Sequence, residues 1–130
     1  MGSIFSKIIA GDLPCHKIAE TEDFLAFLDI MPLAKGHVLV IPKKETDYIF
    51  DIEESLYKDL WAFAQTVSRA VKKAIPCKRV GVAVIGLEVP HAHIHLVPIN
   101  EVGDINFSKE KMKLPAEELE IIAKKIKAAL

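Results

Sequence analysis

Cysteine is scarce in this sequence: Cys15 and Cys77 are the only two among 130 residues. They form neither a Cys-x-x-Cys pair nor a disulfide framework, so we expect free thiols in a reducing compartment, which favours a cytoplasmic protein. Long apolar runs are also lacking, and none approaches the roughly 20 residues that cross a membrane. The N-terminus lacks the charged and apolar regions of a signal peptide. We therefore expect no membrane partner.

An excess of one charge is missing as well. The 17 basic and 18 acidic residues are interspersed and leave a formal net charge of −1. Proteins that bind nucleic acid usually present a basic face, so nothing here indicates a nucleic-acid partner. We find no internal repeat, low-complexity segment or Gly/Ser linker. With 51% hydrophobic and 27% charged residues, the chain fits one globular domain over residues 1–130.

Hydrophobic periodicity predicts short strands interrupted by helices. A short helix is expected over residues 4–9, ending before Gly11. Apolar and β-branched segments predict strands over residues 17–20, 24–30, 37–42, 79–85 and 92–99. Helical spacing predicts a long helix that starts near Asp51 and ends before Pro76, and a last helix from about Pro115. Short turns between neighbouring strands favour antiparallel pairing, so the expected class is α+β, with an antiparallel sheet of about five strands, a long central helix and a C-terminal helix.

Three of the five histidines lie in one run, His91-Ala92-His93-Ile94-His95. Side chains alternate along a strand, so the three imidazoles share one face and Ala92 and Ile94 share the other. Two kinds of chemistry suit this row. The imidazoles can bind zinc together with a ligand from elsewhere. Alternatively, one imidazole can attack phosphorus while its neighbours orient it and protonate the leaving group. The run alone does not decide between them.

Three further segments accompany the histidine run. They are Ile4-Phe5-Ser6-Lys7-Ile8-Ile9, Phe27-Leu28-Asp29-Ile30-Met31-Pro32 and Gly36-His37-Val38-Leu39-Val40-Ile41-Pro42-Lys43. Residues 91–97 meet the pattern His-φ-His-φ-His-φ-φ, in which φ is apolar. Together these segments resemble the HIT (histidine triad) superfamily, and its Hint-like branch in particular. The resemblance covers about residues 4–99, so the chain is identified as a single HIT-like domain with residues 112–130 as a C-terminal helical extension.

The resemblance implies a nucleotide hydrolase or transferase that acts at the α-phosphate of nucleoside phosphoramidates or related nucleotide conjugates. The middle histidine, His93, corresponds to the nucleophile that forms a covalent nucleotidyl-histidine. The histidines that surround it correspond to His91, His95 and His37. The reaction needs neither a metal nor another cofactor, because positioned donors can stabilise the phosphate oxygens.

The same resemblance implies a ligand site and an assembly. Asp29 matches the position that hydrogen-bonds the ribose hydroxyls, a task for which a carboxylate is suited because it accepts from two hydroxyls. Apolar positions that line the base pocket are matched by Phe5, Ile8, Phe27 and Ile30. The expected ligand is a purine nucleotide or nucleotide conjugate, and the expected assembly is a homodimer.

The sequence departs from the family near its start. Many relatives carry a Cys-x-x-Cys pair and a histidine after the Pro-Lys-Lys stretch, which bind a structural zinc together with one triad histidine. The corresponding residues here are Ser3, Ser6 and Glu45. Three ligands are replaced at once, so we expect no metal site.

A second departure precedes the triad. Relatives usually carry an Asn and a Gly-Gln-Ser or Gly-Gln-Thr stretch, where Leu87 and Glu88 replace the polar pair here. Glu88 is expected at the substrate, where it either repels phosphate or hydrogen-bonds a cationic leaving amine.

Three alternative functions stay open. They are a dinucleoside polyphosphate hydrolase, a non-catalytic purine-nucleotide-binding module, and a metal-dependent hydrolase that uses the histidine row as ligands.

Overall fold

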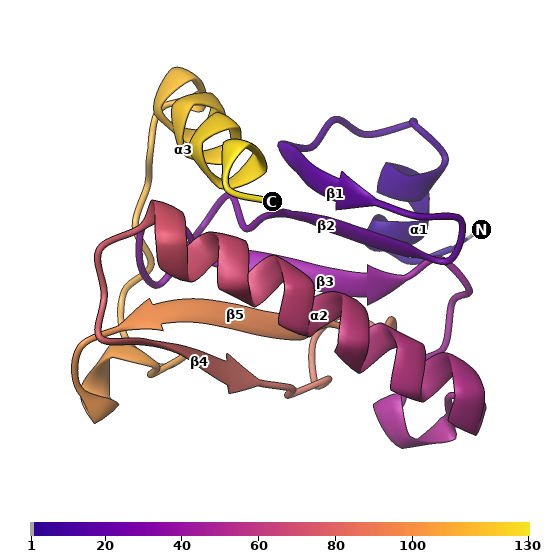
Figure 1. Ribbon diagram of the computed structural model, residues 1–130. Helices are drawn as coiled ribbons and strands as arrows, with labels where there is room; N and C mark the ends of the chain where they lie inside the picture. Colours follow the sequence, from indigo (N-terminus) through magenta and orange to yellow (C-terminus); the bar gives the residue numbers. More distant parts are fainter. Residues whose placement is uncertain (1) are drawn as a thin grey trace.

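The computed structural model describes residues 2–130, which form one sheet with helices on both faces (Figure 1). The strands all pair antiparallel and are β1 (Lys17–Glu20), β2 (Phe24–Leu28), β3 (Val38–Pro42), β4 (Arg79–Ala83) and β5 (Ile94–Ile99). Their order is β1-β2-β3-β5-β4, which leaves β1 and β4 at the edges. The predicted α+β class and five-stranded antiparallel sheet are confirmed.

The helices divide between the two faces of the sheet. They are α1 (Ile4–Ile9), α2 (Glu54–Ala74) and α3 (Ala116–Ala128), with two short 3-10 turns, η1 (Ile49–Asp51) and η2 (Val102–Asp104). α2 and α3 lie on one face, and α1 lies on the other (Figure 1). The C-terminal helix α3 is part of the main core, because Leu119, Ile122 and Ile126 pack into the same buried cluster as α2.

Strand alternation divides the buried side chains into two clusters. Residues such as Ala26, Val38 and Val40 face α2 and α3. Their neighbours on the opposite face pack with Phe5 of α1, and they are Leu25, Phe27, Leu39 and Ile41. The histidine run follows the same rule, because Ala92, Ile94 and Leu96 belong to the large cluster. The three histidines are therefore left for the face that carries α1.

Several elements end at positions that differ from the prediction. β2 stops at Leu28 because the carboxylate of Asp29 accepts a hydrogen bond from the Met31 N–H at 2.9 Å and the chain turns. The long helix is capped by Glu53, whose carboxylate accepts from two backbone N–H groups, whereas Asp51 lies in η1. β4 ends at residue 83 and β5 starts at residue 94, so residues 84–93 form a loop that includes His91 and His93, and His95 is the histidine of the run that lies in the strand.

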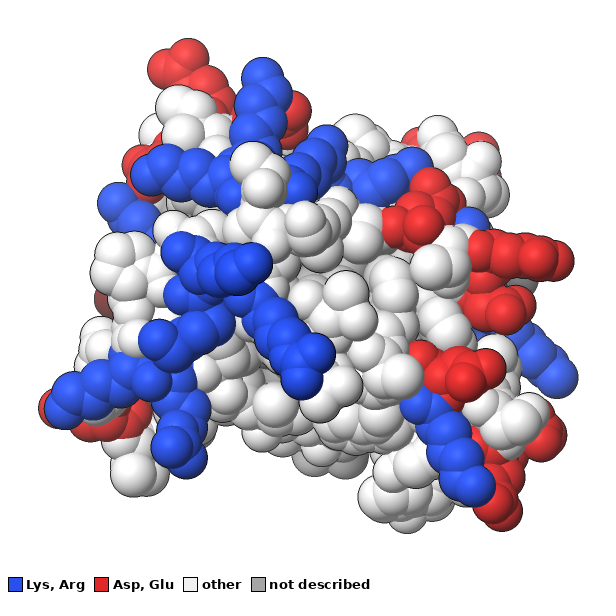
Figure 2. All heavy atoms as spheres, in the orientation of Figure 1, with Lys and Arg blue, Asp and Glu red and all other residues white. Residues whose placement is uncertain are grey.

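Within residues 2–130, no helix has the length and apolar character needed to cross a membrane. Figure 2 shows one face of the molecule, on which Lys and Arg gather over the C-terminal end of α2 and acidic residues gather on the opposite side. The basic group includes Arg69, Lys72, Lys78 and Arg79, which line one shallow depression. Charges that are interspersed along the sequence are thus partly segregated on this surface.

Candidate active site

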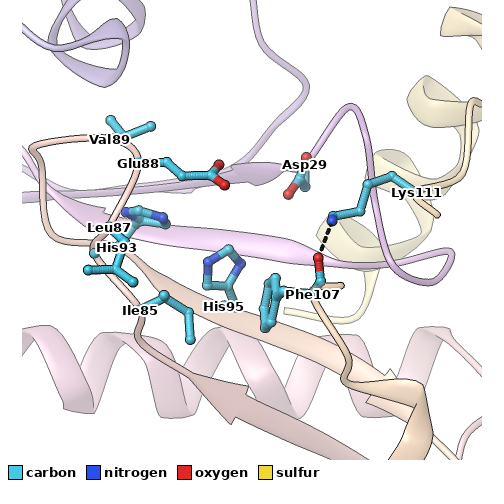
Figure 3. A pocket seen from close by; sticks show the side chains of 10 residues that line it. Asp29, Ile85, Leu87, Glu88, Val89, His93, His95, Phe107 and Lys111 are labelled. Atoms are coloured by element: carbon cyan, nitrogen blue, oxygen red, sulfur yellow. Dashed lines mark hydrogen bonds between the residues drawn. The ribbon is translucent and has the colours of Figure 1, made fainter. Parts of the chain in front are cut away.

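Two pockets share one residue, Asp29, which lines both of them. The first has a volume of about 210 Å³ and contains His93 and His95, with Glu88 at one side (Figure 3). The second has a volume of about 330 Å³ and is bounded mainly by apolar side chains of α1, β2 and the residues after them. This arrangement suits a ligand with an apolar or aromatic ring at one end and an anionic group at the other.

All four residues predicted to line a base pocket do line the apolar pocket: Phe5, Ile8, Phe27 and Ile30. The rings of Phe5 and Phe27 are buried and meet edge to face, with centroids 5.7 Å apart. Ile30 lies at the rim and is 62% exposed. The centroid of the Phe5 ring also lies 5.0 Å from that of His93, so a side chain of the apolar pocket packs against a histidine of the first pocket.

The backbone fixes the orientation of His93. Its Nδ1 lies 2.8 Å from the carbonyl oxygen of His91, and it must donate there because a carbonyl oxygen only accepts. In the neutral ring the lone pair is therefore on Nε2, the nitrogen that remains available to the pocket. A nucleophilic imidazole requires this tautomer.

A second pair of imidazoles forms a hydrogen-bond chain beside His93. The backbone N–H of Leu33 donates to Nδ1 of His37 at 3.0 Å, so His37 carries its proton on Nε2. That Nε2–H donates to Nδ1 of His95 at 2.9 Å. His95 consequently carries its own proton on Nε2, where it can donate to a ligand in the pocket.

Both rings of this chain are neutral. Burial lowers the pKa of His37 to about 4, and the positive charge of Lys111 acts in the same direction. Burial also lowers the pKa of His95 to about 3, with a further contribution from His37. The carboxylate of Asp29 lies 3.7 Å from His37 Nε2. Burial raises the pKa of Asp29.

A glycine explains how the chain reaches His37. Gly36 has a φ of +93°, a left-handed conformation that side chains other than glycine rarely adopt. A Cβ at this position would lie only 2.7 Å from Cγ1 of Ile75. The turn is closed by the His37 N–H, which donates to the carbonyl of Ala34 at 3.1 Å. The Gly-His pair therefore places an imidazole at the start of β3.

His91 is fully buried and has a partner at each ring nitrogen. Its Nε2 donates to the carbonyl of Pro42 at 2.8 Å, and its Nδ1 lies 2.7 Å from Oγ of Ser3. Glu45 accepts from the Ser3 N–H and from the Ser6 hydroxyl, each at 2.6 Å. Ser3 also caps α1 by accepting from the Ser6 N–H. We name Ser3, Ser6, Glu45 and His91 the serine–glutamate cluster.

Comparison with known proteins places the chain in a family. The family model described as HIT domain matches residues 10–102. The chain belongs to the HIT domain family. A protein named adenosine 5'-monophosphoramidase from Schizosaccharomyces pombe is 31% identical over 132 residues, covering 100% of this chain and 99% of that protein.

Solved HIT structures share the fold. A Hit-like protein from Bartonella henselae, described as involved in cell-cycle regulation, has a TM-score of 0.87 and 35% identity, over 98% of this chain and 96% of that one. A zinc-bound histidine triad family protein from Mycobacterium smegmatis has a TM-score of 0.83 and 30% identity, over 97% of this chain and 91% of that one.

The serine–glutamate cluster does not fit the structural zinc that the HIT resemblance associates with these positions. Zinc is held in such sites by thiolates and imidazoles, whereas this cluster offers two neutral hydroxyls, one carboxylate and one imidazole. Each hydroxyl already has a hydrogen-bond partner, and the Glu45 oxygen lies 4.0 Å from His91 Nδ1. Hydrogen bonds therefore join α1, the end of β3 and the triad here.

Asp29, His37 and His95 form the one group of His, Cys, Asp and Glu in the described chain with potential ligand atoms within 4.8 Å of one another. A metal would need a free lone pair on both facing ring nitrogens. In the hydrogen-bond chain, His37 Nε2 carries a proton and donates it to His95. His93 is not a member of the group. The geometry therefore favours hydrogen-bonded imidazoles over the metal-dependent alternative.

Phe107 and Lys111 line the histidine pocket and were not predicted from the sequence. The Phe107 ring lies 4.6 Å from the ring of His95, and Lys111 lines the same pocket (Figure 3). Both belong to the segment after η2, beyond the resemblance. Glu88, which was predicted to approach the substrate, also lines the pocket. A lone lysine or phenylalanine in a polar loop has no distinguishing pattern, so no sequence signal identified this wall.

The neutral histidines predict acid destabilisation. An unfolded imidazole has a pKa near 6.5, whereas His37 and His95 have folded-state values of about 4 and about 3. The unfolded chain therefore binds more protons below pH 6.5. The free energy of unfolding should fall by on the order of 2–4 kcal/mol between pH 7 and pH 5. Urea titrations at both pH values measure this change, and unchanged stability over the interval would contradict the buried neutral pair.

Metal content tests the serine–glutamate cluster. We expect the wild-type protein to retain no zinc after dialysis against a weak chelator. The variant Ser3→Cys/Ser6→Cys/Glu45→His should retain about one zinc per chain, because two thiolates and a second imidazole then surround His91. Elemental analysis by mass spectrometry gives the ratio. Equal and tight zinc binding by both proteins would show that the native donor set does hold metal.

Proposed function

We propose that this HIT protein is a nucleotide hydrolase or transferase that acts at the α-phosphate of nucleoside phosphoramidates or related conjugates. The observation that carries the proposal is the pair of pockets joined at Asp29. An apolar pocket of about 330 Å³ suits a base, and the carboxylate suits ribose hydroxyls. The histidine pocket beyond it suits the phosphate. The name of the fission-yeast relative supports phosphoramidates as substrates.

The proposed reaction has two displacement steps. His93 Nε2 attacks the α-phosphorus, a bond from nitrogen to phosphorus forms, and the bond to the leaving nitrogen breaks. The leaving nitrogen takes up a proton from solvent at the open mouth of the pocket and departs as an amine. Water then attacks the nucleotidyl-histidine, which releases the nucleoside monophosphate and restores the imidazole.

The other imidazoles support these steps without changing protonation. The Nδ1–H bond from His93 to the His91 carbonyl keeps Nε2 unprotonated and stabilises the positive charge that develops on the ring during attack. The Nε2–H of His95, set by the donor chain from Leu33 through His37, is available to stabilise a phosphate oxygen. The proposal therefore needs no metal ion.

Removal of the nucleophile tests the mechanism. His93→Ala should lower the turnover of an adenosine phosphoramidate by at least about 1,000-fold, as removal of a covalent nucleophile usually does, and should abolish the nucleotidylated peptide seen after acid quench by mass spectrometry. His37→Ala should weaken turnover without abolishing it.

His16→Ala, which changes an imidazole that pairs with Glu120 outside both pockets, is the matched control and should keep wild-type turnover. Turnover by His93→Ala at the control rate would refute the mechanism. Tight binding of AMP by the wild type with neither turnover nor adduct would instead identify a nucleotide-binding module.

We propose that two copies associate through the edge strand β4. Within the described chain β4 pairs with β5 alone, so one of its edges has unpaired backbone groups. Large apolar side chains are exposed around it: Val82 is 49% exposed, Ile85 is 50% exposed and Phe50 is 67% exposed. Ile85 and Phe50 line a hollow with Trp61, whose buried Nε1 has no partner among the described residues. A second copy would cover this apolar surface.

Light scattering during size-exclusion chromatography tests the dimer. The wild-type protein should elute with twice the chain mass, and Val82→Lys should shift it toward one chain mass because a buried charge opposes association. Val102→Lys is the control, since Val102 lies in η2 and is 89% exposed. A wild-type protein that remains at one chain mass at micromolar concentration would rule out this assembly.

A further inference from the structure

The histidine pocket is short of positive charge for a site that receives a phosphate. Its walls contain two acidic side chains, Asp29 and Glu88. Both His37 and His95 are neutral because burial lowers the pKa of each ring. Leu87, which is 88% exposed, offers no polar group. Among the described residues that line the pocket, Lys111 is the one lysine or arginine.

Lys111 is held in place by the backbone around it. Its Nζ donates to the carbonyl of Phe107 at 2.7 Å, which is one of the three hydrogen bonds that an ammonium group can donate. The next residue, Met112, donates its N–H to the carbonyl of Pro32 at 2.9 Å, which joins this segment to the loop after Asp29. The amine is therefore fixed beside Asp29, with two hydrogens left to donate.

The same segment also contacts the histidines. The centroid of the Phe107 ring lies 4.6 Å from that of His95 and 6.3 Å from that of His37. In Figure 3, Lys111 and Phe107 form the wall opposite Glu88, and the Lys111 amine points toward the space between Asp29 and His95. Residues 107–112 thus provide a cation and an aromatic side chain on the side that the histidine run leaves open.

We propose that Lys111 is a substrate-binding residue that donates to the phosphate oxygens of the bound nucleotide, an inference that rests on the function proposed above. Lys111 comes from the segment after η2 and supplies a donor to phosphate. The side chains of Leu87 and Glu88, on the opposite wall of the pocket, do not supply one. Charge-assisted hydrogen bonds to phosphate are about twice as strong as neutral ones. The ligand class it selects is the nucleotide, in preference to the uncharged nucleoside.

A pair of ligands that differ only in the phosphate tests this role. Isothermal titration calorimetry compares the binding of AMP and of adenosine to the wild type and to Lys111→Met. This substitution keeps the length of the side chain and its apolar stem but removes the ammonium group. Lys111→Met should weaken AMP binding at least about tenfold, or about 1.4 kcal/mol, and change adenosine binding less than twofold. Lys111→Arg should recover most of the preference for AMP.

Lys109→Met is the matched control, because this lysine lies in the same segment but is exposed and does not line the pocket. It should bind both ligands as the wild type does. If Lys111→Met loses AMP and adenosine equally, or neither, the phosphate contact is wrong while the proposed function stands. If the wild type binds neither ligand, the proposed function fails and this inference fails with it.

Discussion

The site depends on one constraint: four imidazoles are buried, so each needs partners that fit one protonation state. His37, His91, His93 and His95 are all at most 8% exposed. Backbone groups settle each tautomer, because an N–H can only donate and a carbonyl can only accept. The Leu33 N–H donates to His37, which in turn donates to His95. The carbonyl of His91 orients His93, and the carbonyl of Pro42 orients His91. The chemistry of the rings is thus fixed by the path of the main chain.

The sheet brings these partners together. β3 pairs with both β2 and β5, so Asp29 after β2 and His37 before β3 lie side by side, and His95 of β5 lies next to His37. Asp29 N–H donates to the His37 carbonyl at 3.0 Å and extends that pairing by one step. The carboxylate that borders the apolar pocket is therefore held beside the imidazole chain. The position of Asp29, the residue that both pockets share, therefore follows from strand pairing.

The sequence predicted the parts of this site that follow a local rule. Alternation along a strand was sufficient to place Ala92 and Ile94 in the core and the histidines on the opposite face. Tautomers were beyond reach, since the partner of His37 is the N–H of Leu33 in a turn whose shape depends on Gly36. Strand ends were wrong by two residues at β2, β4 and β5, because hydrogen bonds such as that from Met31 to Asp29 end a strand without changing its hydrophobic pattern. The wall of residues 107–112 was missed because only tertiary contacts distinguish Lys111 from any surface lysine.

The two departures from the family motif differ in what replaces the missing groups. Near the start, Ser3, Ser6 and Glu45 occupy the positions of zinc ligands and bind one another and His91, so the connection between α1 and the triad is preserved within the same residues. Before the triad, the side chains of Leu87 and Glu88 supply no hydrogen-bond donor, and the lysine that lines this pocket comes from a segment beyond η2. A substitution in the first group is therefore compensated locally. The departure before the triad makes phosphate binding depend on how residues 107–112 lie against the loop after Asp29. The C-terminal part of the chain thereby contributes to the specificity of the site.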